Sequence, residues 1–173
     1  GKAEKQDRYQ ANKLLELAAN QGLLAAQLLL DGSSEKSILN SSEAKELCIE
    51  LAERNDARAL YSLARRKMMG WMMDIEMDRK KLVELFKQSA DSGYSRAQYT
   101  MGMLHMTGEV VGQNIETAFW WLKSAAAQNH PLALHHIGIC YAQGIVVEPD
   151  IEQAFNYFSR SAELGIDAAK NSL

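Results

Sequence analysis

Two side chains of the kind that can do chemistry, His136 and Cys140, stand four residues apart. On a helix this spacing places both on one face, where they could supply two metal ligands or a thiol beside a general base. The sequence offers no obvious third ligand and no group to orient the histidine. Cys140 also falls in the expected apolar core of its helix. An enzyme that uses His136 and Cys140 is therefore kept only as an alternative to two packed structural residues.

Other signatures of catalysis or cofactor binding do not stand out along the chain. The two cysteines, Cys48 and Cys140, are far apart and lack metal-type spacing, which predicts two buried free thiols. We find no phosphate-binding glycine loop and no nucleophile motif. We therefore predict a protein that is not an enzyme, with no catalytic residues, no metal and no cofactor.

The overall composition argues against two classes of partner. The chain has 173 residues, of which 47% are hydrophobic, and a formal net charge of −3. This charge argues against a nucleic-acid binder, and no apolar run is long enough for membrane insertion. We expect a soluble protein, either cytoplasmic or, after removal of a signal, periplasmic or secreted.

The elements that carry these residues repeat along the chain. Residues 97–132 align with residues 133–168, and ten aligned positions are identical, most of them small or apolar. A repeat of this length is typical of stacked helical units. Two prolines in the whole chain, and no sustained apolar–polar alternation, favour helices over strands. We therefore predict an all-α solenoid of antiparallel helix pairs, each pair made of a helix A, a loop and a helix B.

One repeat domain is expected over residues 1–173. The predicted parts are an unpaired helix at 7–25, repeats at 26–58 (degenerate), 59–96, 97–132 and 133–168, and the start of a further helix at 169–173. Because the pattern begins on a helix B and ends inside a helix A, we expect an excerpt of a longer array. The native chain should continue past Leu173, or this end should pack on another copy.

Residues suited to helix ends flank every predicted helix B. Asp and Asn cap a helix N-terminus, whereas Gly and Asn tolerate the left-handed conformation that follows a C-terminus. The predicted N-caps are Asp7, Asn40, Asp78, Asn114 and Asp150, and the predicted left-handed residues are Gly22, Asn55, Gly93, Asn129 and Gly165. Pro131 suits the first turn of the next helix A.

Small residues predict where paired helices approach closely. Ala118 and Ala154 lie on the B helices, and Gly102 and Gly138 are expected opposite them on the A helices. Larger anchors should fill the space between units, and these are Phe86, Phe119, Phe155 and Phe158.

The small, aromatic and loop residues of the units form a recognisable run. In the fourth unit this run is Ala133, Ile137, Gly138, Tyr141, Gly144, Val147, Asp150, Ala154, Tyr157, Phe158, Ser161, Ala162 and Gly165. It resembles the Sel-one-like repeat (SLR), a branch of the tetratricopeptide-repeat (TPR) class, although Val110 and Val146 replace a loop glycine. The resemblance implies a right-handed superhelix whose concave wall is lined by A helices. It also implies adaptor or scaffold work through protein binding, with toxin neutralisation among the roles of some members.

The side of the A helices that points away from their predicted core is unusual. Such a surface is normally charged and polar, but here it is aromatic, rich in methionine and basic, as binding surfaces are. The predicted partner-binding residues are Arg58, Tyr61, Arg65, Met68, Met69, Arg96, Tyr99, Met103, Met106 and His135.

These residues favour a scaffold or adaptor that binds a protein or peptide in its concave groove. The arginines make an acidic or carboxylate-bearing segment with apolar anchors the expected ligand. One alternative is an immunity or inhibitor protein that neutralises a toxin or hydrolase. Another is that the aromatic and methionine side chains only pack against their own neighbouring helices.

Overall fold

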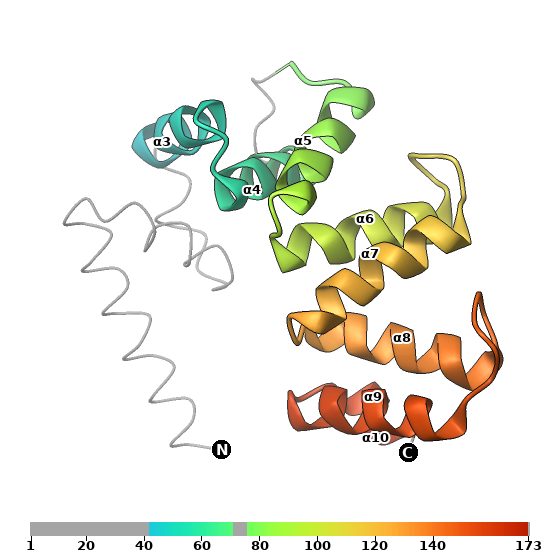
Figure 1. Ribbon diagram of the computed structural model, residues 1–173. Helices are drawn as coiled ribbons and strands as arrows, with labels where there is room; N and C mark the ends of the chain where they lie inside the picture. The colour runs from blue at the N-terminus through green and yellow to red at the C-terminus, as the bar shows by residue number, and fades with distance from the viewer. Residues whose placement is uncertain (1–41, 71–75, 173) are drawn as a thin grey trace, which may run out of the picture. The chain divides into compact units, whose positions relative to one another are not determined.

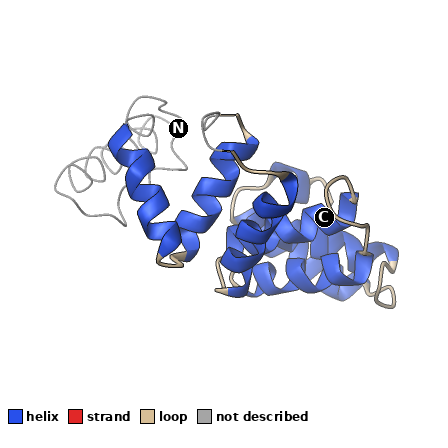
Figure 2. Ribbon diagram, turned by 90° about the horizontal axis from the view of Figure 1, so that it is seen from above, coloured by secondary structure: helices blue, strands red, loops and turns tan. Residues whose placement is uncertain are grey.

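The computed structural model describes residues 42–70 and 76–172, and every regular element in these ranges is an α-helix (Figures 1 and 2). The helices are α3 (Ser42–Glu53), α4 (Ala57–Met68), α5 (Arg79–Asp91), α6 (Ser95–Thr107), α7 (Ile115–Ala127), α8 (Pro131–Gln143), α9 (Ile151–Glu163) and α10 (Asp167–Lys170). The prediction of an all-α chain of stacked helix pairs is confirmed. The predicted helix at 7–25, its cap Asp7, and the end signals Gly22 and Asn40 lie outside the described residues.

The chain divides into two compact units, residues 1–76 and 77–173, and each is described by itself. In the first unit, α3 packs against α4. Cys48 is buried between them, and its thiol donates to the carbonyl oxygen of Ala59 at 3.6 Å. Whether the two units form one repeat domain stays a prediction.

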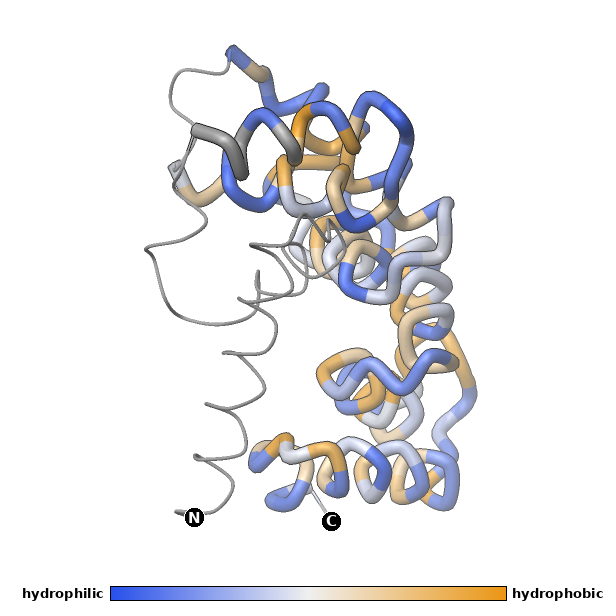
Figure 3. The backbone as a smooth tube through the Cα atoms, turned by 90° about the vertical axis from the view of Figure 1, so that its left-hand side faces the viewer, coloured by the Kyte–Doolittle hydropathy of each residue, from blue (hydrophilic) through white to orange (hydrophobic). Residues whose placement is uncertain are grey.

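In the second unit, consecutive helices from α5 to α10 pack against one another. The most extensive contacts join α6 to α7 and α8 to α9, which are the predicted A and B helices of the third and fourth repeats. Figure 3 shows apolar and polar stretches alternating along these helices, as expected when each helix buries one face. In this description α4, α6 and α8 are A helices, and α5, α7 and α9 are B helices.

The ends of the described B helices follow the predicted chemistry. The side chains of Asp78, Asn114 and Asp150 each accept a hydrogen bond from a backbone N–H in the first turn of α5, α7 and α9. The predicted left-handed residues have positive φ angles: 59° at Asn55, 87° at Gly93, 58° at Asn129 and 92° at Gly165. Pro131 is the first residue of α8. These predictions are therefore confirmed.

Close helix packing also occurs where the small residues predict it. Ala118 and Ala154 are buried. A Cβ atom added at Gly102 would lie 2.7 Å from Cγ of Leu122, and one added at Gly138 would lie 2.6 Å from the Phe158 ring. Contacts this short are sterically excluded, so both glycines are required for the observed approach of A and B helices.

One of the four predicted phenylalanine anchors is wrong. Phe86, Phe119 and Phe158 are buried, but the side chain of Phe155 is 57% exposed. Phe119 is covered by Tyr141 from α8, with ring centroids 6.3 Å apart. No described element supplies an equivalent ring to Phe155.

Val146 is the one valine of the described residues with a positive φ angle, 71°. A β-branched side chain in this left-handed region costs about 1–2 kcal/mol, whereas glycine adopts it freely. Val146→Gly should therefore raise the free energy of unfolding by up to about 1 kcal/mol, measured by urea denaturation. Val110→Gly is the matched control, because Val110 occupies the same loop position without a positive φ and should gain nothing. A loss of stability in both variants would contradict the strain assigned to Val146.

Candidate functional site

The predicted partner-binding residues fall into two sets, one in each compact unit. Arg58, Tyr61, Arg65, Met68 and Met69 lie on α4 or at its end. The other set lies on α6 and α8, and we call it the α6–α8 surface: Arg96, Tyr99, Met103, Met106 and His135. Since each unit is described by itself, a continuous surface that joins the two sets stays a prediction.

The position of α4 is set by its cap and its apolar face. The carboxylate of Asp56 accepts from the backbone N–H groups of Arg58 and Ala59, at 3.0 and 2.9 Å. Met68 and Met69 lie outside the buried face of α4, and their exposed fractions are 54% and 46%. Basic residues fill the last turn, where they complement the helix dipole; they are Arg65, Arg66 and Lys67. Exposed methionines beside positive charge can make adaptable contacts to an acidic partner.

On α6 the core face and the α6–α8 surface are distinct. Ala97, Met101 and Gly102 are buried against neighbouring helices, whereas Tyr99, Met103 and Met106 are half-buried. Tyr99 and Met106 also pack against the core of the third and fourth repeats. These two side chains thus have a packing role in addition to any contact with a partner.

The ring of Tyr99 joins α6 to α8. It stacks on His130, with centroids 4.7 Å apart and planes at 17°, and its Oη lies 3.5 Å from Nε2 of His136. His135 continues the row, because its ring centroid is 5.9 Å from that of His136 and 5.5 Å from that of Phe158. Side chains from two successive A helices therefore form one aromatic and imidazole row.

Sequence reasoning missed His130, and it considered His136 as a metal ligand, a general base or a packed structural residue but not as part of a binding surface. The 36-residue alignment pairs Tyr99 with His135, so it predicts which residues are equivalent but not which ones touch. The sequence could have indicated His130 as a helix cap, because it stands directly before Pro131, the expected first residue of the helix.

The histidines of this row are held neutral at pH 7. Burial, helped by the positive charge of Arg96, lowers the pKa of His130 from its ordinary value of 6.5 to about 4. Burial also lowers the pKa values of His135 and His136. Nδ1 of His130 accepts from the backbone N–H of Ala133 at 3.3 Å, so the ring hydrogen is on Nε2. His130 is therefore both the N-cap of α8 and a neutral donor.

Acid should destabilise the second unit through His130. The folded state binds fewer protons than the unfolded state between the folded pKa of about 4 and the unfolded value of 6.5, so stability is lost as the pH falls through this range. Allowing for the solvent-exposed part of the ring, we expect a loss of about 1–2 kcal/mol. Urea unfolding at a series of pH values measures this loss. His130→Asn keeps a capping residue and should remove most of the slope; an unchanged slope would contradict the role of His130.

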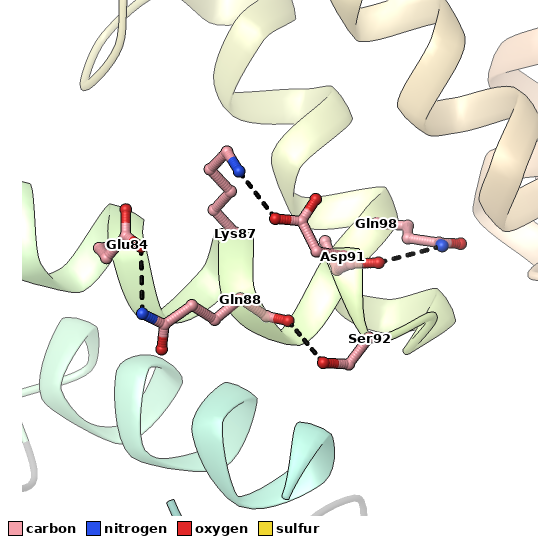
Figure 4. Close-up of polar contacts among 7 residues, drawn as sticks. Glu84, Lys87, Gln88, Asp91, Ser92 and Gln98 are labelled. Carbon is pink, nitrogen blue, oxygen red and sulfur yellow. Dashed lines mark hydrogen bonds and ion pairs between the residues drawn. The ribbon is translucent and has the colours of Figure 1, made fainter. Parts of the chain in front are cut away.

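A glutamine network holds the start of the α6–α8 surface in place. Nε2 of Gln98 donates to the carbonyl oxygen of Ala90 at the end of α5, at 3.2 Å (Figure 4). Nε2 of Gln128 donates to Oε1 of Gln98 at 2.8 Å and to the carbonyl oxygen of Gly93 at 2.9 Å. These bonds tie α5, α6 and the end of α7 together, which positions the turn of α6 that carries Arg96 and Tyr99.

The surroundings of Cys140 do not favour nucleophilic chemistry. Burial raises the pKa of its thiol, whereas a reactive cysteine needs a lowered pKa. Both cysteines are buried and free, as predicted. Across residues 42–70 and 76–172 there is no group of three or more His, Cys, Asp or Glu side chains that could hold a metal ion. Within the same ranges, no helix has both the length and the apolar character needed to cross a bilayer.

Comparison with known proteins identifies the repeat. A family model described as Sel1 repeat matches residues 1–23, 57–94, 95–130 and 131–166. The last three matches begin two residues before the predicted repeats at 59–96, 97–132 and 133–168. Residues 24–56, which include most of the predicted degenerate repeat, lie outside the matches.

Two curated relatives match about three fifths of the chain. "DAP3-binding cell death enhancer 1" of Rattus norvegicus is 33% identical over 104 residues, which cover 60% of this chain and 20% of that protein. "Chitin synthase regulatory factor 2" of Schizosaccharomyces pombe is 30% identical over 107 residues, with coverage of 61% and 21%. The chain thus spans about a fifth of the length of these relatives.

Two solved structures share the fold. A Sel1 repeat protein from Oxalobacter formigenes is 27% identical, with a TM-score of 0.68 and coverage of 73% of this chain and 93% of that chain. A protective antigen of uropathogenic Escherichia coli with an SLR fold is 24% identical, with a TM-score of 0.66 and coverage of 93% and 35%.

Proposed function

Because this chain belongs to the Sel1 repeat family, we propose that it is a non-catalytic scaffold that binds a segment of another protein along its A helices. The observation that carries the proposal is the α6–α8 surface itself. Its tyrosine, methionines and histidine are half-buried on the A helices, where charged residues would normally face water. Tyrosine and methionine provide large and adaptable contacts at protein interfaces.

The relatives support this kind of role without supplying the partner. One is named as a DAP3-binding protein and another as a regulatory factor of chitin synthase. Each name refers to a second protein, DAP3 or a chitin synthase. Since this chain covers only about a fifth of either relative, the identities of those partners are not carried over.

Site-specific photo-crosslinking in the native source tests the proposal. A benzophenone amino acid in place of Met103 should form adducts with a partner protein, which mass spectrometry then identifies. The matched control places the same residue at Asn156, an exposed position on the B helix α9, where no adduct is expected. Adducts at Asn156 alone, or equally at both positions, would contradict binding along the A helices. A single folded toxin or hydrolase crosslinked at Met103 would instead favour the immunity or inhibitor role.

A further inference from the structure

Arg96 provides an exposed positive charge on the α6–α8 surface. Its side chain is exposed at the start of α6, and no described residue forms an ion pair with it. By contrast, Lys87 on the preceding helix pairs with Asp91 at 2.7 Å (Figure 4). The Arg96 guanidinium is therefore available for a carboxylate, which it can bind through two parallel hydrogen bonds.

His130 adds a second donor at the same place. Arg96 and Tyr99 are three residues apart on α6 and so share one face of the helix, and Tyr99 stacks on His130 with ring centroids 4.7 Å apart, which brings Arg96 and His130 to the same region; the charge of Arg96 also acts on His130. Since Nδ1 of His130 is engaged by Ala133, its Nε2 carries the ring hydrogen. Beside this pair, Tyr99 stacks on the His130 ring and Met103 lies one turn further along α6. The arrangement combines a cation and a neutral donor with an adjacent apolar surface.

We propose that Arg96 and Nε2–H of His130 bind a carboxylate of the partner, so that the α6–α8 surface accepts an acidic peptide segment with apolar residues beside the acidic one. This inference rests on the proposed function and names the chemistry of its ligand. Charge complementarity supports this inference. A carboxylate can accept hydrogen bonds from both the arginine and the neutral donor next to it, and it also balances the positive charge of the arginine.

Binding of such a carboxylate should be coupled to proton uptake. Tyr99 from α6 stacks on the His130 ring and also reaches His136, and Arg160 from α9 donates to the adjacent Asn129 at 2.8 Å. The charge that acts on His130 is the positive charge of Arg96, and none of these groups is a carboxylate. A bound carboxylate would supply the missing negative charge and favour protonated His130. Affinity should therefore rise as the pH falls from about 7 to about 5.5.

The probe is a short blocked peptide that contains glutamates and a few leucines, and its control carries glutamine at each glutamate position. Fluorescence polarisation should show that the glutamate peptide binds about tenfold more tightly than the glutamine peptide, with a difference that shrinks at high salt. Arg96→Gln should abolish this difference. Arg79→Gln is the matched control, because Arg79 is exposed in the first turn of α5, and it should keep the difference.

Three results would overturn the inference. They are equal affinity for the two peptides, failure of both peptides to bind, and an equal effect of Arg96→Gln and Arg79→Gln. If the glutamine peptide binds as well as the glutamate peptide and Tyr99→Ala weakens both, the scaffold proposal survives while the carboxylate site fails. The crosslink at Met103 decides the scaffold proposal separately.

The pH dependence of the affinity distinguishes a His130 that contacts the ligand from a His130 that only caps α8. A purely structural His130 would not make the affinity for the glutamate peptide depend on pH in this way. The affinity of the unmodified chain for the glutamate peptide should increase severalfold between about pH 7 and about pH 5.5. His130→Asn, which preserves a helix cap, should remove this increase. The same pH dependence in both proteins would count against His130 as part of the site.

Discussion

Ala118→Leu should lower the free energy of unfolding by about 1–3 kcal/mol, because the new side chain has no space between α6 and α7. Ala118 is completely buried. Its carbonyl oxygen lies only 3.3 Å from the point that a Cβ on Gly102 would occupy, so the two helices are in close contact here. Thermal unfolding followed by circular dichroism should show the loss as a melting temperature lower by roughly 2–4 °C for each kcal/mol.

Ala127→Leu is the control for this substitution. Ala127 is exposed at the end of the same helix, α7, so leucine there should leave the melting temperature nearly unchanged. If Ala118→Leu melts at the same temperature as the unmodified chain, the close approach of α6 and α7 is wrong.

Tyr99→Ala should weaken partner binding by about 2 kcal/mol, which is roughly a thirtyfold loss of affinity. The substitution removes the ring that links α6 to His130 and His136. Isothermal titration calorimetry with the crosslinked and identified partner measures the loss. Tyr99→Phe keeps the stacked ring and should retain most of the affinity.

A loss of folding in Tyr99→Ala would assign Tyr99 to packing, in line with its contacts to the core. Met103→Ala then tests the same surface, because Met103 is half-buried. Full affinity in a folded Met103→Ala protein would place the binding site elsewhere.

The sequence predicts the parts of this fold that depend on local chemistry. Asp150 caps a helix and Asn129 adopts a left-handed conformation because of interactions within a few residues. Gly102 and Gly138 could be assigned to close helix contacts because the repeat aligns them with each other. Adjacent positions on a helix point in different directions, and accordingly Trp121 is only 6% exposed while its neighbour Trp120 is 59% exposed.

The features that depend on neighbouring elements were harder to predict. Phe155 aligns with the buried Phe119, but burial requires a ring from the next helix, which the alignment of one position does not supply. The contacts of Tyr99 with His130 and His136 depend on how α6 and α8 are rotated about their axes. Such rotation follows from packing of the whole unit, so equivalent positions in two repeats need not touch.

The central claim is that a partner binds the outward side of the A helices, and the methionine methyl signals test it most directly. Met103 and Met106 lie on the α6–α8 surface, whereas Met101 on the same helix is buried in the core. In spectra of methyl-labelled protein, addition of the identified partner should shift or broaden the Met103 and Met106 signals and leave the Met101 signal nearly unchanged. Unchanged Met103 and Met106 signals in a protein saturated with partner would contradict the claim.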